Sequence, residues 1–152
     1  MTLAARGWEH FLAGDLTSAL VDLSLAIEHT PTAAEVYVRR GAVWMAANRL
    51  PEAIADLTTA ISLGAEDAAT YDLRGDALRA AGELSAAHGD YSSALARDRT
   101  YVPSLLSRAA INLLLGDVPG AVADYSTATE IMGSPTETES PSRLISNSNA
   151  GF

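Results

Sequence analysis

The chain repeats itself every 34 residues, and this period limits the folds open to it more than any other feature. An Arg-Gly pair recurs at Arg6/Gly7, Arg40/Gly41 and Arg74/Gly75, and it becomes Arg108/Ala109 in the fourth copy. Later in each copy, an Ala is followed by an Asp after three residues and by another Ala after four more. Four such copies without a gap indicate a repeat array, in which each unit buries its apolar face against its neighbours.

Each unit predicts two amphipathic helices joined by a tight turn. The turns are expected at Gly14-Asp15, Asn48-Arg49, Gly82-Glu83 and Gly116-Asp117, because Gly and Asn accept the left-handed conformation that ends a helix. Apolar residues at spacings of three and four continue after each turn. We expect first helices at about 2–13, 34–47, 68–81 and 102–115, and second helices at about 17–29, 51–63, 85–97 and 119–131.

The pattern within the units resembles that of the tetratricopeptide repeat (TPR) family. The second unit supplies Tyr37, Arg40-Gly41, Trp44, Ala53, Leu57 and Ala60 at the positions of the family pattern. The match departs at His10 and Asn112, which occupy the aromatic position, and in lacking a closing Pro after units two to four. The resemblance implies an all-α fold, a right-handed α-solenoid of antiparallel helix pairs, with units at about 1–33, 34–67, 68–101 and 102–133.

Small residues in the repeat predict where helices cross closely. Gly41 and Ala53 are small, whereas Tyr37, Trp44 and Leu57 are bulky enough to fill the space around the crossing. We expect a larger residue at Gly41 or Ala53 to cost roughly 1–3 kcal/mol of stability.

One Arg and one Asp recur in every unit, on the first and second helix respectively. Two interpretations are open: a repeated structural ion pair across each helix crossing, or a ladder of ligand-binding charges. Recurrence in all four units favours structural ion pairs. The residues are Arg6 with Asp22, Arg40 with Asp56, Arg74 with Asp90, and Arg108 with Asp124.

Charge and composition exclude several classes of partner and site. The net charge is −9, with nineteen acidic residues against ten basic ones, and all the basic residues are Arg. A phosphate backbone would be repelled by this balance, so no nucleic acid is expected. The absence of Cys excludes disulfides and thiolate ligands. No apolar run is long enough to span a membrane and no leader pattern is present, so the default expectation is a soluble cytoplasmic protein.

By resemblance, the first helices line a concave ligand groove. Core residues lie on a different face of each first helix, so the groove does not compete with the core. The Lys and Asn residues with which one branch of the family holds chaperone carboxylates are absent here. The predicted groove residues are Trp8, Phe11, Glu35, Val38, Arg39, Met45, Asp72, Leu73, Asp76, Arg79 and Leu106.

The predicted groove starts aromatic, becomes charged and ends aliphatic. This order favours a peptide or helix with apolar anchors and at least one basic residue, for which Asp72 and Asp76 would be counter-charges. The alternative is that these two carboxylates are satisfied internally, by Arg39 across the groove and by Arg79 along the helix.

Nothing in the sequence predicts catalysis, a metal or a cofactor. His10, His29 and His88 belong to different repeat positions, and no two of them stand three or four residues apart. Asp72 and Asp76 alone are weak grounds for a metal. No Gly-rich phosphate loop or nucleophile elbow is present.

The ends of the array raise separate expectations. Nothing before the first helix or after Met132 resembles the polar cap that such arrays need, and residues 134–152 are rich in Ser, Thr and Pro, which predicts a disordered tail. We expect a non-enzymatic scaffold for an unidentified protein or peptide partner. Two alternatives are a regulatory or sensor module of a larger assembly and a homo-oligomer that assembles through its uncapped ends.

Overall fold

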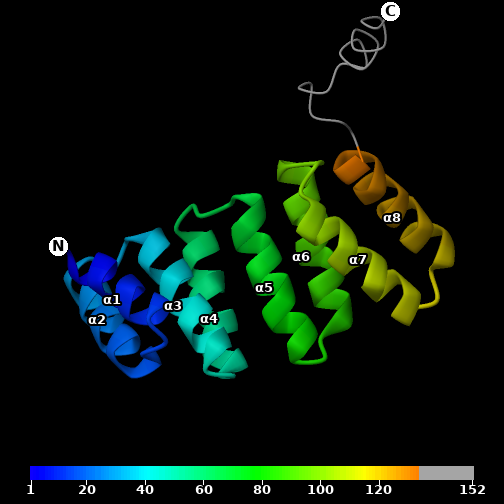
Figure 1. Cartoon of the computed structure of the whole chain (residues 1–152). Coiled ribbons are helices and arrows are strands. Elements are labelled where there is room, and N and C mark those ends of the chain that lie inside the picture. The colour runs from blue at the N-terminus through cyan, green and yellow to red at the C-terminus, as the bar shows by residue number, and fades with distance from the viewer. Residues whose placement is uncertain (134–152) are drawn as a thin grey trace, which may run out of the picture.

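The structure is a computed structural model that describes residues 1–133, and this part of the chain is a row of antiparallel helix pairs (Figure 1). It contains eight helices and no strand, so the predicted all-α solenoid is confirmed. The predicted tail, residues 134–152, lies outside the described residues. The helices are α1 (Leu3–Leu12), α2 (Leu16–His29), α3 (Ala34–Ala46), α4 (Leu50–Ser62), α5 (Ala68–Ala80), α6 (Leu84–Arg97), α7 (Val102–Leu114) and α8 (Val118–Gly133).

The turns within the pairs have the predicted conformation. Gly14 has φ of 83° and Asn48 has φ of 55°, both in the left-handed region that the sequence led us to expect. The second helices begin one residue earlier than predicted. In the first unit this is because Asp15 is the N-cap: its carboxylate accepts a hydrogen bond from the Ser18 backbone N–H at 3.0 Å, which makes Leu16 the first helical residue.

Close helix crossings within the pairs are confirmed at the glycines of the repeat. A Cβ added at Gly41 would lie 2.9 Å from Leu57 Cγ, and one added at Gly75 would lie 2.7 Å from Tyr91 Cε1. Both distances are shorter than van der Waals contact, so neither site has room for a side chain unless the neighbour moves.

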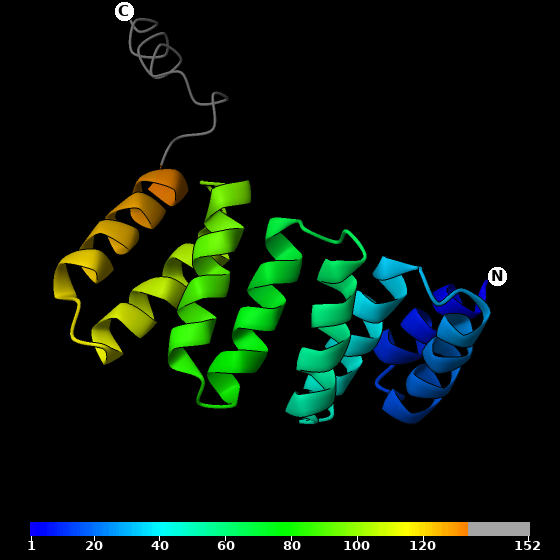
Figure 2. The same cartoon turned by 180° about the vertical axis from the view of Figure 1, so that it is seen from behind.

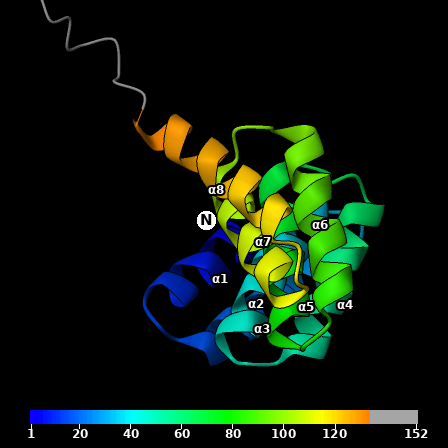
Figure 3. The ribbon, with the colours of Figure 1, turned by 90° about the vertical axis from the view of Figure 1, so that its right-hand side faces the viewer.

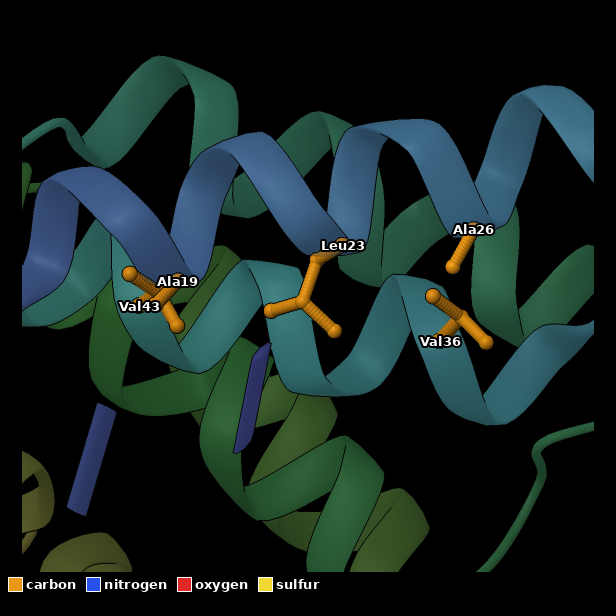
Figure 4. Close-up of a cluster of buried hydrophobic side chains, with 5 residues drawn as sticks. All are labelled: Ala19, Leu23, Ala26, Val36 and Val43. Carbon is orange, nitrogen blue, oxygen red and sulfur yellow. The ribbon is translucent and has the colours of Figure 1, made fainter. Parts of the chain in front are cut away.

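The core is a series of clusters along the row rather than one central core. Figure 4 shows the first cluster, in which Ala19, Leu23 and Ala26 of α2 face Val36 and Val43 of α3. Further clusters join later units in the same way. Stability in such an array is shared between the pairs and the joints between neighbours.

The row curves with its first helices on the inner side. In residues 1–133, α1 contacts α3, α3 contacts α5 and α5 contacts α7, whereas no second helix contacts another second helix. Figure 1 looks at the face formed mainly by first helices, and Figure 2 looks at the opposite face, where α4 and α6 lie in front. Figure 3, seen along the row, shows that successive pairs are rotated relative to one another. First helices therefore line the concave side.

Candidate functional site

The four Arg–Asp pairs of the repeat meet in the structure. Each Arg uses Nε and one terminal nitrogen to hold both carboxylate oxygens of its Asp, at 2.6–2.8 Å in all four units. All four Asp residues are buried. Because both oxygens of each carboxylate are already bound, these groups are poorly placed to bind a ligand. Their structural role stays a prediction, which a substitution can test.

The same Arg residues also connect one unit to the next, which the sequence reasoning missed. The third nitrogen of Arg40, Arg74 and Arg108 donates to a hydroxyl of the preceding unit at 3.1–3.2 Å. The side chain of Arg6 makes no such contact in residues 1–133, and it is 54% exposed against 20% for Arg40. The hydroxyls belong to Ser24, Thr58 and Ser92, and the fixed 34-residue spacing of these residues was a signal that could have revealed the contacts.

A hollow of about 690 Å³ lies on the concave side, between α1, α3, α5 and the start of α7. Its walls combine apolar and acidic side chains. It is lined by Trp8, Ala34, Glu35, Val38, Ala42, Leu63, Gly64, Ala65, Asp67, Ala69, Thr70, Asp72, Leu73 and Tyr101. We refer to this space as the concave hollow.

Part of the predicted groove lines this hollow. The residues that do so are Trp8, Glu35, Val38, Asp72 and Leu73. Of the others, Phe11 packs against the first core cluster and its ring lies 4.9 Å from that of Trp8. The remaining predicted residues, which do not line the hollow, are Arg39, Met45, Asp76, Arg79 and Leu106.

Arg39 forms a local cluster at the edge of the hollow. Its guanidinium lies 5.7 Å from the centre of the Trp8 ring, donates to the backbone oxygen of Ala4 at 3.4 Å, and forms an ion pair with Glu35. The expected pair between Arg39 and Asp72 is not formed, because Glu35, one turn away on the same helix, holds the guanidinium instead.

Asp72 is a buried carboxylate, only 8% exposed, that borders the hollow. Its Oδ1 accepts a hydrogen bond from Ser104 Oγ at 2.6 Å. Burial raises the pKa of the Asp72 carboxyl above its ordinary value, and nearby Asp76 also raises it, whereas the Ser104 hydrogen bond and the charge of Arg79 lower it. The ionised form of Asp72 is therefore disfavoured at this buried position.

Asp76 is satisfied within the chain. Its Oδ1 accepts hydrogen bonds from the Tyr91 hydroxyl at 2.7 Å and from Arg79 at 3.3 Å. Burial together with the neighbouring Asp76 raises the pKa of Tyr91, so this hydroxyl keeps its proton. The predicted pairing of Asp76 with Arg79 is thus present, and Asp76 is a poorer counter-charge for a ligand than Asp72.

The sequence reasoning missed the part of the hollow supplied by loops. Leu63, Gly64 and Ala65 come from the α4–α5 loop, which spans 63–67 and contains Gly64 at φ of 101°. Tyr101 precedes α7 and reaches the hollow from the next unit. The left-handed backbone of Gly64 turns the chain after α4, but this local signal does not indicate that the loop reaches the concave side.

Candidate metal ligands do not form a cluster in the described part of the chain. Within residues 1–133, no group of three His, Asp or Glu side chains is placed to hold a metal. His10 lies 3.7 Å from Asp22, beside the Arg6 pair. None of the helices in residues 1–133 has both the length and the apolar character needed to cross a membrane.

Comparisons with known proteins agree on the fold. No protein-family model matches this chain, and no curated protein matches it. Among solved structures, MamA from Desulfovibrio magneticus is 20% identical over 88% of this chain and 75% of that one, with a TM-score of 0.81. A tetratricopeptide repeat protein from Parabacteroides merdae is 22% identical over 93% of this chain and 55% of that one, with a TM-score of 0.79.

A third solved structure is the first TPR of Spaghetti bound to the HSP90 peptide SRMEEVD. It is 20% identical over 75% of this chain and 93% of that one, with a TM-score of 0.72. Together these likenesses show that this chain has the tetratricopeptide repeat fold, as the repeat pattern led us to expect.

Proposed function

We propose that this protein is a non-enzymatic interaction scaffold that binds a peptide or helix of a partner protein in the concave hollow. The observation that carries the proposal is the lining of that hollow, where exposed apolar surface from three first helices surrounds a few carboxylates. Sites of this size and composition suit a short segment with apolar anchors and few polar contacts.

The peptide held by the first TPR of Spaghetti supports a peptide-binding role for the same fold, but not the same ligand. That peptide, SRMEEVD, contains three acidic residues. In this chain, Glu35, Asp67 and Asp72 line the hollow and would repel it. We therefore expect a neutral or basic segment.

Self-assembly would require α1 of one copy to stack on α8 of another. Tyr125 is 39% exposed, although its repeat counterpart Tyr91 is fully buried, so α8 has an uncovered face. However, Glu9 occupies the repeat position that Val43 and Ala77 fill in units two and three, where both are fully buried. Stacking of α1 on α8 would bury that carboxylate, so we do not propose head-to-tail assembly.

The test compares two variants that add the same side chain at different places. Ala69 is exposed and lines the hollow, so Ala69→Trp fills it. Ala86 is exposed on α6, away from the hollow, so Ala86→Trp is the matched control. A displayed library of random peptides is first selected on the wild-type chain, and affinities of the selected peptides are then measured by fluorescence anisotropy.

We expect Ala69→Trp to weaken binding of the selected peptides at least about tenfold, because the ring occupies their volume. Ala86→Trp should bind them as the wild type does. Peptides that bind all three proteins equally would place binding elsewhere and contradict the proposal.

A further inference from the structure

Asp72 differs from the other buried carboxylates in residues 1–133. Each of the others accepts two hydrogen bonds from the Arg of its own unit. Asp72 is equally buried, yet its only hydrogen-bond donor in this part of the chain is the hydroxyl of Ser104, which is bound to Oδ1. No guanidinium or ammonium of the described residues forms an ion pair with it.

The other oxygen of Asp72 is accessible from the concave hollow. Oδ2 accepts no hydrogen bond. In residues 1–133, every fully buried side-chain oxygen has a hydrogen-bond partner, so Oδ2 is not fully buried and solvent can reach it. Asp72 lines the hollow, and the hollow is therefore the route by which a donor would reach it.

Cations near the hollow are already engaged. Arg39 is held by Glu35 and by the Trp8 ring, and Arg79 is held by Asp76. The carboxylate of Asp67, which also lines the hollow, adds negative charge. A cation supplied from outside is thus favoured in this hollow by its electrostatic field.

We propose that the concave hollow takes a lysine side chain from a segment of the partner protein, with its ammonium on Asp72 Oδ2. This inference rests on the proposed function and names the chemistry of its ligand. Leu73 and Val38 line the hollow beside Asp72 and would cover the aliphatic stem of the lysine. Trp8 and Tyr101 at the walls suit apolar neighbours of that lysine in the peptide.

The Ser104 contact explains why lysine is preferred over arginine. A guanidinium pairs best with both oxygens of a carboxylate, as the four Arg–Asp pairs of this chain do. At Asp72, the Ser104 hydroxyl already occupies Oδ1 at 2.6 Å. An ammonium is a compact donor that needs only Oδ2.

The experiment uses four pools of peptides on the full immobilised chain. Each peptide is N-acetylated and C-amidated, so that the central side chain is its only source of a cation. The flanking positions are a mixture of Leu, Val, Ala and Ser. The central residue is Lys, Arg, norleucine or Glu, and retention of each pool is measured by mass spectrometry.

On the wild-type chain, we expect the Lys pool to be retained about tenfold more than the norleucine pool, which has a side chain of similar length without the charge. The Arg pool should lie between them, and the Glu pool should be retained least. In Asp72→Asn, which keeps an oxygen for Ser104, the difference between Lys and norleucine should vanish.

Two variants at Ala69 show whether a loss of binding in Asp72→Asn comes from a folding defect. Ala69 is exposed and lies three residues before Asp72 on α5, so Ala69→Lys supplies an ammonium from the chain itself. This variant should lose the preference for the Lys pool, and Ala69→Gln, which is long but neutral, should keep it. Ser104→Ala frees Oδ1 and should bring the Arg pool level with the Lys pool or above it.

The outcomes separate this inference from the proposed function. Equal retention of the Lys and norleucine pools on the wild type, with retention lost in Ala69→Trp, would overturn the lysine inference and leave peptide binding in the hollow intact. Retention that Ala69→Trp does not change would contradict the proposed function as well. A Lys preference that survives in both Asp72→Asn and Ala69→Lys would overturn the role of Asp72.

Discussion

Replacing Gly75 by Ala should destabilise the protein, although Ala is the better helix former. The added Cβ would lie 2.7 Å from Cε1 and 3.0 Å from Cδ1 of the Tyr91 ring. That ring is fully buried, and its hydroxyl is bound to Asp76, so it cannot swing away without breaking a hydrogen bond. Overpacking of this kind costs about 1–3 kcal/mol, and the gain in helix propensity returns about 1 kcal/mol.

The matched control is Gly89→Ala on α6. Gly89 is exposed, and an added Cβ there meets no atom within 4 Å, so this variant should gain about 1 kcal/mol from helix propensity alone. Because both variants make the same Gly→Ala change inside a helix, propensity cancels when they are compared. The remaining difference in free energy of unfolding, about 1–3 kcal/mol, isolates the clash with Tyr91.

The assay is urea unfolding of both variants and the wild type, followed by circular dichroism of the helices. Unit four offers a natural comparison, because Ala109 stands at the position of Gly75 and Tyr125, the counterpart of Tyr91, is 39% exposed. A ring with an uncovered side can move, whereas Tyr91 cannot. If Gly75→Ala were as stable as Gly89→Ala, the close crossing would not be a constraint and the packing argument would be refuted.

Three further predictions concern charges and ends. Arg74→Ala should lower the free energy of unfolding by about 3–5 kcal/mol, because it leaves Asp90 buried without its partner. Arg79→Ala, which removes a more exposed ion pair, should lower it by less than about 1 kcal/mol. Equal losses of the two variants in urea titrations would contradict the structural role of the Arg74–Asp90 pair. Because the pKa of Asp72 is raised, the folded state binds a proton at this carboxyl more tightly than the unfolded state does. The free energy of unfolding therefore falls as the pH rises from the pKa of Asp in the unfolded chain, about 3.9, through the higher pKa of Asp72 in the folded chain. Asp72→Asn should therefore be more stable relative to wild type at pH 7 than it is in acid. A stability difference that does not change with pH would show that burial of the charge is not its cause. Sedimentation should give a mass that does not depend on protein concentration, because Glu9 disfavours stacking of α1 on α8 of another copy. A mass that rises with concentration would support self-assembly.

The fold could be predicted from the sequence because the information needed is local and repeated. Gly14 and Asn48 mark turns because Gly and Asn accept the left-handed backbone conformation that both adopt in the structure. The spacing of Leu16, Ala19 and Leu23 marks the apolar face of a helix. Each of these signals acts over a few residues and recurs every 34, so four copies reinforce one another.

The binding surface could be predicted only in part, because it depends on how far the row curves. Val38 and Leu73 follow from the face of their helices, and both line the hollow. Met45 shares that predicted face but does not line the hollow. Tyr101 and the 63–65 loop enter it because curvature brings them inward, and no residue in their own segments encodes that curvature.

The choice of partners for Asp72 was also beyond the sequence. Arg39 and Arg79 both seemed available to it by spacing. In the structure, Glu35 and Asp76 hold these guanidiniums, because each lies within one turn on the same helix. Which of several acids pairs with one Arg depends on the distances between the side chains, which repeat spacing does not give.

The repeated Arg residues form stronger hydrogen bonds within a helix pair than between neighbouring pairs. Within a pair, Arg74 grips Asp90 with two charge-assisted bonds, whereas a single bond at 3.2 Å joins it to Thr58 in the preceding pair. We therefore expect the row to bend at the junctions between pairs, where apolar packing such as the first core cluster still holds neighbouring pairs together. The concave hollow lies between α1, α3, α5 and the start of α7, so a change in the angle between neighbouring pairs would change its width.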